Sequence, residues 1–267
     1  MNFRKYLKVN WFSTLFFNLK VFPLGVAVKL PILLFGRVNT RATKRGSIEF
    51  RCQPKPGLIR IGYVSISWET DTKRSTYQVQ GKHIVHGDCA FGAGSTIVVG
   101  ENGILETGKK VWFNVHTKLH CREHIIIEDA CVFAWECQIM DTDFHYLVNN
   151  GSIIKNTSPI HIGYGVWSGN RVSINKGSNI PAMSVIASGS IVNKFFPDVP
   201  QRNLLAGSPA KVVRGNCSRL FYKDICASGG ITAADKALDK FFAENDVNSI
   251  GLGEERLMSY INSDEIM

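Results

Sequence analysis

The sequence predicts a mainly β protein built as a parallel β-helix, a solenoid of short strands wound into triangular coils. Three observations predict it: an aliphatic residue recurs every six positions, a small residue occupies the fifth position of each hexad, and Gly and Asn fill the places between. From Ile162 onward the hexads read IGYGVW, SGNRVS, INKGSN, IPAMSV, IASGSI and VNKFFP. Upstream, IEDACV, FAWECQ and IMDTDF keep the same register. A fixed internal period of this kind is the signature of a repeat architecture.

A period of six fits neither an amphipathic helix nor an alternating strand. It fits short extended segments joined by tight turns, in which three hexads close one coil and equivalent residues stack about 4.8 Å apart. The aliphatic side chains then fill the interior, and the small ones sit near the crowded corners. Gly and Asn supply turn conformations that most residues resist. The first hexad positions are Ile162, Ser168, Ile174, Ile180, Ile186 and Val192.

The 267-residue chain is expected to contain three parts. Residues 59–215 are expected to form the β-helix, although the hexads upstream of residue 125 slip in register. Residues 1–58 form a basic, aromatic and partly helical N-terminal arm. Residues 216–267 form a C-terminal helical extension, because the segment TAADKALDKFFAEND has apolar residues on one side of a helix. That helix would cover the last coil or a neighbouring subunit.

The net charge of +9 lies in the N-terminal arm. Residues 1–45 hold nine Lys or Arg and no acidic residue, whereas the rest of the chain is balanced at 22 against 22. A neutral body argues against nucleic-acid binding. The arm either makes a peripheral contact with an anionic membrane surface or packs its aromatic residues on the body or a neighbouring subunit. Lys20 and Lys29 interrupt its apolar run, so we expect no transmembrane span. Asn18 and Lys20 likewise argue against a cleaved signal peptide.

The cysteine content indicates the cellular compartment. Seven cysteines with no C-x-x-C pair form no disulfide framework, so we expect reduced thiols in a cytoplasmic protein. If the arm binds lipid, the protein would lie at the inner face of the membrane.

The repeat breaks between Ile139 and Ile162, which are 23 residues apart and therefore not a multiple of six. Residues 141–160 must leave the coil as a loop, and a long excursion from a regular solenoid tends to be functional. The loop contains His145, and imidazole is the side chain best suited to accept a proton near neutral pH. Asp143 or Asp141 could orient the ring, and a backbone carbonyl would serve as well.

The run from IHIGYGVWSGNRVSINKGSNI through LLAGSPAKVVR resembles the hexapeptide-repeat acyltransferases, particularly the galactoside and maltose O-acetyltransferase type and bacterial polysaccharide O-acetyltransferases. The resemblance is strong over residues 125–215 and weaker over 59–124. It implies a left-handed β-helix, an exception to the usual right-handed crossover, and a homotrimer. It also implies transfer of acetyl from acetyl-CoA to a sugar hydroxyl of a surface polysaccharide or its precursor. His145 occupies the place of the family's catalytic histidine.

The resemblance implies direct transfer. His145 removes a proton from the hydroxyl, the alkoxide attacks the thioester, and a tetrahedral oxyanion collapses to release CoA thiolate. A backbone N–H around Gly169 and Asn170 is the implied donor to that oxyanion. No covalent serine intermediate is expected, because the chain lacks a G-x-S-x-G motif.

Further site residues are implied by matching positions. CoA needs a groove for its pantetheine arm and cations near its phosphates. The groove residues are Trp167, Asn170, Ser188 and Asn193, and the cations are Lys194, Lys211 and Arg214. The family more often has Thr where Asn193 stands, and the link FFPDVPQRN is about three residues longer than usual, so the cations could instead be a solvated face. For the sugar, Asn114 matches an acceptor-binding asparagine, while Trp135 and Met140 either form an apolar platform or simply cover the coil.

Two other functions remain open from the sequence. Some hexapeptide-repeat proteins are carbonic anhydrases that bind metal through histidines of neighbouring coils, and His116, His120 and His124 are spaced by four. Their segment continues into β-branched residues without a helical apolar stripe, so we expect no metal. The other alternative is a non-catalytic trimeric scaffold. The acceptor sugar, and the choice of acetyl over longer acyl groups, are not determined by the residues.

Overall fold

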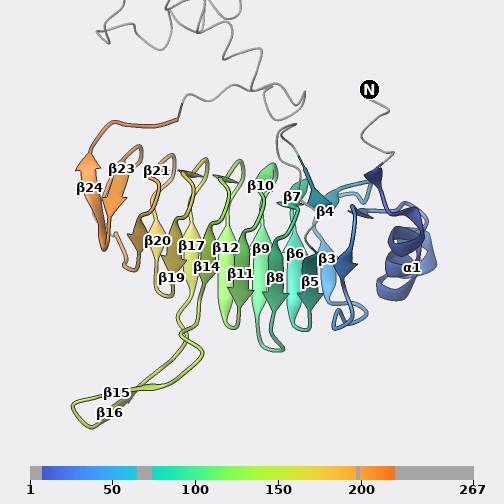
Figure 1. The fold of residues 1–267 in the computed structure, drawn as a ribbon, viewed down its shortest axis with the longest axis horizontal. Helices are drawn as coiled ribbons and strands as arrows, with labels where there is room; N and C mark the ends of the chain where they lie inside the picture. The colour runs from blue at the N-terminus through green and yellow to red at the C-terminus, as the bar shows by residue number, and fades with distance from the viewer. Residues whose placement is uncertain (1–7, 65–73, 197–198, 220–267) are drawn as a thin grey trace, which may run out of the picture. The chain divides into compact units, whose positions relative to one another are not determined.

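The protein is represented by a computed structural model that describes residues 8–64, 74–196 and 199–219. The described part is a row of stacked coils with a helix at one end and a hairpin projecting from one side (Figure 1). The predicted C-terminal helix lies outside the described residues. None of the described helices is long and apolar enough to cross a bilayer.

Successive strands along the chain belong in turn to three parallel sheets, named here sheets 1, 2 and 3. Sheet 1 contains β1 (Ile32–Leu34), β4 (Ile59–Tyr63), β7 (Cys89–Gly92), β10 (Val111–Phe113), β13 (Val132–Phe133), β18 (Trp167–Ser168), β21 (Val185–Ile186), β23 (Leu204–Gly207) and the antiparallel β24 (Ala210–Arg214). Sheet 2 contains β2 (Val38–Asn39), β5 (Ser75–Val79), β8 (Thr96–Val99), β11 (Lys118–Cys121), β14 (Gln138–Met140), β19 (Ser173–Asn175) and β22 (Ile191–Val192). Sheet 3 contains β3 (Ile48–Phe50), β6 (Lys82–Val85), β9 (Ile104–Thr107), β12 (His124–Ile127), β17 (Ile160–Ile162) and β20 (Asn179–Ile180).

The strand register confirms the predicted fold class. Ile162 pairs with Ile180, Ser168 with Ile186 and Ile174 with Val192. Each of these pairs is 18 residues apart, so three hexads close one coil and the predicted first positions stack on one another. The chain is therefore mainly β, with three parallel sheets that are consistent with a left-handed β-helix.

The coil begins earlier than the predicted boundary at residue 59. β1, β2 and β3 already pair in parallel with β4, β5 and β6. The pattern hides this because the first coils have long turns: Ile32 pairs with Ile59, which is 27 residues later rather than 18. An 18-residue period is visible only where every turn has its minimum length.

The arm is helical in part, as predicted. α1 (Trp11–Val21) is capped by Asn10, whose side chain accepts a hydrogen bond from the Ser13 N–H at 3.1 Å. It is followed by the short α2 (Leu24–Ala27). One side of α1 carries Asn18 and Thr14, whose side chains hydrogen-bond to the backbone of β1. The Asn18 amide donates to the Ile32 carbonyl at 2.7 Å and accepts from the Ile32 N–H at 3.2 Å. The Thr14 hydroxyl accepts from the Leu34 N–H at 3.0 Å. The helix thereby satisfies the backbone groups of an edge strand that would otherwise be open to other chains.

The interior is filled as the hexads predict. Aromatic rings of successive coils stack, with centroid distances of 4.8 Å between Phe91 and Phe113 and 4.7 Å between Phe113 and Phe133. Cys131 and Cys137 are buried at the small fifth position. Burial raises the pKa of both thiols, to about 12 for Cys131. These thiols therefore serve packing rather than nucleophilic chemistry.

Candidate active site

The loop that carries His145 leaves sheet 2 after β14 and returns to the coil at β17. Thr142 and Thr157 form an antiparallel bridge at its root, and β15 (Leu147–Asn149) and β16 (Ser152–Ile154) form the hairpin that projects from the coils (Figure 1). His145 is exposed and lies between the bridge and the hairpin. The excursion predicted for residues 141–160 is therefore present, with the imidazole near its attachment to the coil.

The Asp141 side chain forms hydrogen bonds within the coil and none with His145. The residue is fully buried, and its two carboxylate oxygens accept hydrogen bonds from the backbone N–H groups of Arg122 and Glu123, each at 2.7 Å. Desolvation raises the pKa of Asp141, against the opposing effect of these N–H groups. Because both oxygens hold the turn of the preceding coil, the predicted orienting role for Asp141 is not supported.

Asp143 is paired with a lysine. Its Oδ2 lies 2.6 Å from the Nζ of Lys176, which also donates to the carbonyl of Lys155 at 2.8 Å. The link between Asp143 and His145 is through the backbone, where the His145 N–H donates to the Asp143 carbonyl at 2.7 Å. Lys176 follows β19 in the next coil, so the ion pair fastens the loop root to the neighbouring coil. In this structure the Asp143 carboxylate pairs with the Lys176 ammonium, and its role in orienting the imidazole stays a prediction.

Phe144 holds the other side of the loop root. Its backbone has a φ of 64°, and its N–H donates to the Thr142 hydroxyl at 2.9 Å. Its ring packs edge-on against His120, with a centroid distance of 5.4 Å, and the Arg122 guanidinium lies 5.7 Å from its centre. Among the described residues, no hydrogen bond to the His145 imidazole is formed. The backbone around His145 is held by hydrogen bonds, while the residue itself is exposed.

The predicted site residues divide between two corners of the coil. Those at the turn from sheet 1 to sheet 2 follow β10, β13, β18 and β21, and they stack over one another; they are Asn114, Trp135, Gly169, Asn170 and Ser188, with Trp167 at the end of β18. Those at the turn from sheet 2 to sheet 3 are Met140, Asp141, Asp143, His145, Asn193 and Lys194. Lys211 and Arg214 are exposed on β24. One chain does not bring all of the predicted residues together.

The first of these corners is tightly stacked. The Gly169 N–H donates to the Ile186 carbonyl at 2.8 Å, and a Cβ on Gly169 would lie 2.8 Å from the backbone nitrogen of Ser188. Only glycine allows the two coils to approach this closely. Trp167 is half-buried beside this turn, with the Arg219 guanidinium 5.7 Å from its ring centre. An aromatic ring and small residues therefore line this corner.

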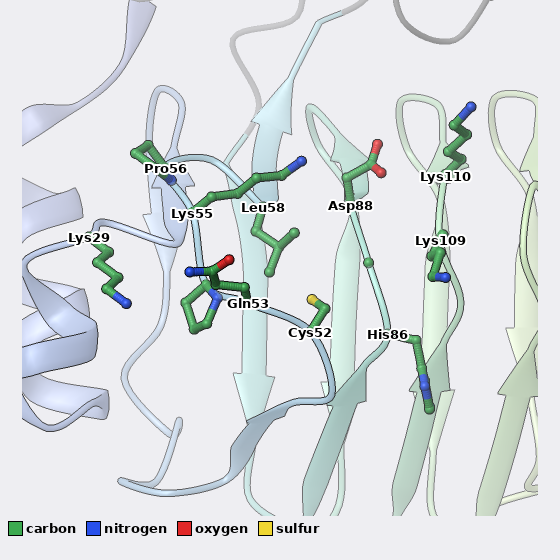
Figure 2. A pocket seen from close by; sticks show the side chains of 12 residues that line it. Lys29, Cys52, Gln53, Lys55, Pro56, Leu58, His86, Asp88, Lys109 and Lys110 are labelled. Atoms are coloured by element: carbon green, nitrogen blue, oxygen red, sulfur yellow. The ribbon is translucent and has the colours of Figure 1, made fainter.

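A hollow of about 710 Å³ lies at the third corner, where sheet 3 turns to sheet 1 in the first coils (Figure 2). Its charged and polar lining comes from four separate segments; these residues are Lys29, Cys52, Gln53, Lys55, His86, Asp88, Lys109 and Lys110. Burial raises the pKa of the Cys52 thiol, while Lys55 and Lys109 oppose that shift. The hollow contains none of the residues predicted for acetyl transfer. Sequence reading missed it because its lysines are distant in the chain.

The histidines considered for a metal make other contacts. His124 Nε2 lies 2.9 Å from Glu106, and His120 packs against Phe144. Burial, Lys118 and Arg122 lower the pKa of His120. Within residues 8–64, 74–196 and 199–219, no group of three or more His, Cys, Asp or Glu side chains is placed to hold a metal ion.

Sequence comparison identifies relatives over part of the chain. No family model matches it. The Escherichia coli (strain K12) galactoside O-acetyltransferase is 44% identical over 70 residues, which is 26% of this chain and 32% of that protein. The Staphylococcus aureus (strain COL) protein SACOL2570 is 42% identical over 72 residues, which is 27% of this chain and 33% of the relative. The chain thus spans about a third of the length of the curated relatives that it matches.

Solved structures with similar coordinates include the polysialic acid O-acetyltransferase OatWY, with a TM-score of 0.48 and 21% identity over 79% of this chain and 98% of that one. The galactoside acetyltransferase in complex with coenzyme A has a TM-score of 0.37 and 20% identity over 83% of this chain and 86% of that one. Because these TM-scores lie below 0.5, the fold is assigned from the strand pairing and not from these structures. The sequence relatives nevertheless confirm that this chain resembles the hexapeptide-repeat acetyltransferases.

Proposed function

We propose that this protein is an acetyl-CoA-dependent O-acetyltransferase that acts on a sugar hydroxyl. The observation that carries the proposal is an exposed His145 at the hydrogen-bonded root of the loop of residues 141–160. It is supported by the 44% identity of 70 residues of this chain to a galactoside O-acetyltransferase. The acceptor that we propose is a bacterial surface polysaccharide or its precursor. The use of acetyl-CoA would place the reaction on the cytoplasmic side of the membrane.

In the proposed reaction, His145 accepts the proton of the sugar hydroxyl as the oxygen attacks the thioester carbonyl. Because the Gly169 N–H already donates to the Ile186 carbonyl, the proposed donor to the oxyanion is the backbone N–H of Asn170. The C–S bond then breaks, CoA leaves as the thiolate, and the imidazolium gives its proton to that sulfur, which restores the neutral base. Both Asp141 oxygens accept backbone hydrogen bonds, so in this scheme Asp143 or a backbone carbonyl orients the ring when substrate binds. Transfer is direct, with no acyl-enzyme.

We propose a homotrimer, and the division of the site between two corners supports a site shared by two copies. The base lies at the turn from sheet 2 to sheet 3, whereas Trp167, Asn170 and Ser188 lie at the turn from sheet 1 to sheet 2. A second copy that sets its groove against this loop would complete the site. The hairpin offers apolar surface for such a contact, because Val148 is 72% exposed and Ile153 is 74% exposed.

The coenzyme and acceptor assignments follow from this arrangement. We propose that the pantetheine arm runs along the stacked turns at Trp167 and Ser188, and that exposed Lys211 and Arg214 meet the phosphates. Asn114 and Trp135 would contact the sugar, because they belong to the same stack, Trp135 one coil and Asn114 two coils before Trp167.

The central test measures thiol release by the purified full-length chain with acetyl-CoA and candidate sugars. We expect acceptor-dependent release that His145→Ala abolishes. His86→Ala, which removes a half-buried histidine at a different corner, is the matched control and should keep the activity. Asp143→Asn distinguishes the two orienting groups: turnover should fall less than about tenfold if a carbonyl orients the ring, because the carboxylate then only neutralises Lys176, and further if Asp143 does. Full activity of His145→Ala would refute the proposal.

The shared site has its own test. His145→Ala and Ser188→Trp, which fills the proposed groove, should each be inactive alone. When the two variants are unfolded together and refolded as mixed oligomers, some sites would combine an intact histidine with an intact groove. Recovery of activity would support a site built from two copies, and no recovery with normal mixing would place the whole site in one chain.

A further inference from the structure

The exposed face of α1 is apolar, although α1 already has a buried side. Phe12 is 84% exposed and Phe16 is 65% exposed. This face, named here the arm face, consists of Trp11, Phe12, Leu15, Phe16 and Leu19, and Leu24 and Val28 at α2 are exposed as well. Contiguous exposed apolar side chains of this kind mark interaction surfaces.

The geometry of the helix separates the two sides. At about 100° per residue, the exposed side chains of α1 cover an arc of about 140°. The buried side chains, Phe17 and Val21 with Thr14 and Asn18, lie across the helix from that arc. They already join α1 to the core and close the edge of β1. The arm face therefore contributes nothing to packing within the described part of the chain.

Positive charge borders the arm face. No acidic residue occurs before Glu49. Lys20 lies at the margin of the arc, and its Nζ donates to the Arg41 carbonyl at 3.0 Å, which brings two cationic residues together beside the helix. Lys8 and Lys29 are exposed at the start of α1 and after α2. The nearest acidic residue along the chain, Glu49, is already paired with Arg51 at 2.8 Å.

We propose that the arm face docks on a lipid bilayer that carries anionic headgroups. Aromatic and aliphatic side chains would enter the boundary between headgroups and acyl chains, and the bordering lysines and arginines would contact lipid phosphates. A second protein copy is a poorer occupant, because two such faces would bring their cations together without any carboxylate from the arm. Figure 1 shows α1 at the end of the coils beyond β1, away from the hairpin and from β23 and β24. Docking would leave the proposed catalytic loop free.

The test is flotation of the purified full-length protein with vesicles. One set consists of phosphatidylcholine alone, and the other contains 30% phosphatidylglycerol. We expect the native chain to float with the anionic vesicles and to remain largely unbound with the neutral ones. Phe12→Gln with Phe16→Gln should reduce the partition coefficient at least tenfold, because both rings lose their burial in the lipid. The matched control is Phe195→Gln with Val213→Gln, which removes two exposed apolar side chains, 55% and 58% exposed, that lie outside the arm face, and it should leave flotation unchanged.

Three results would overturn the inference. The first is native protein that does not float with anionic vesicles. The second is equal flotation of the Phe12 and Phe16 double variant, with its fold confirmed by circular dichroism. The third is a double variant that has a smaller oligomer by sedimentation velocity while its vesicle binding is unchanged, which would assign the arm face to contacts between copies. Weaker binding as sodium chloride rises from 0.1 to 0.5 M would support the role of the cations.

Discussion

His83 provides a direct test of how completely the coil interior excludes water. The imidazole is fully buried, with Nδ1 2.7 Å from the Tyr77 hydroxyl and Nε2 2.9 Å from the Thr107 hydroxyl. Burial lowers the pKa of His83 from 6.5 to about 3. The ring is therefore neutral in the folded chain at every pH at which the protein would normally be handled.

The sign and size of the effect follow from linkage. The unfolded chain takes up a proton at His83 below about pH 6.5, whereas the folded chain does so only near pH 3. The stability that the neutral ring contributes is complete above the pKa of His83 in the unfolded chain. It is lost as the pH falls toward the pKa of His83 in the folded chain. At about 1.36 kcal/mol per pH unit, lowering the pH from 7 to 5 should remove about 2 kcal/mol of unfolding free energy through this residue alone.

The assay is urea unfolding of the native chain and of His83→Gln at pH 7 and pH 5. Other titrating groups cancel in the difference between the two proteins, so that difference should shrink by about 2 kcal/mol at the lower pH. Nitrogen NMR of the native protein should show the His83 ring neutral at pH 5. A stability difference that stays constant within about 0.5 kcal/mol, or a ring that titrates near 6.5, would show that water reaches the coil interior and would refute the reasoning.

Three further predictions concern the coil and its loop. Asp141→Asn should lower the unfolding free energy by about 2–4 kcal/mol, because an amide cannot accept from both of the N–H groups that the buried carboxylate holds; a loss under about 1 kcal/mol in urea unfolding would contradict this. Gly169→Ala should cost about 1–3 kcal/mol by crowding the next coil, whereas Gly25→Ala in α2, which has open space around it, should stabilise by about 0.5–1 kcal/mol in the same measurement. Brief alkylation of the native protein, mapped by mass spectrometry, should label Cys52 and Cys217, which are partly exposed. The buried thiols should react more slowly; they are Cys89, Cys121, Cys131 and Cys137. Labelling of both groups at the same rate would show that the coil opens readily.

The later coils and the loop could be read from the sequence because their signals are local. From Ile162 each turn has its minimum length, so the 18-residue register of the structure is the hexad pattern itself. The gap of 23 residues after Ile139 located the excursion and His145 within it. The first coils were missed because longer turns between Ile32 and Ile59 conceal the same strand pairing.

The partners of individual side chains were not readable in the same way. Asp141 and Asp143 stand beside His145 in the sequence, yet one holds the turn at Arg122 and the other pairs with Lys176. In a stacked coil the nearest neighbour in space is about one turn of the solenoid away, so proximity along the chain says little about contact.

The sequence by itself determined a β-helix, a neutral body with a basic arm, and one histidine in a break of the repeat. Only the tertiary structure decided that α1 closes the edge of the first coil while exposing its other side, that the lysines of Figure 2 share one hollow, and that the base and the groove lie at different corners. The physical reason is that periodicity sets which side chains face inward, whereas stacking brings together residues from turns far apart in the chain.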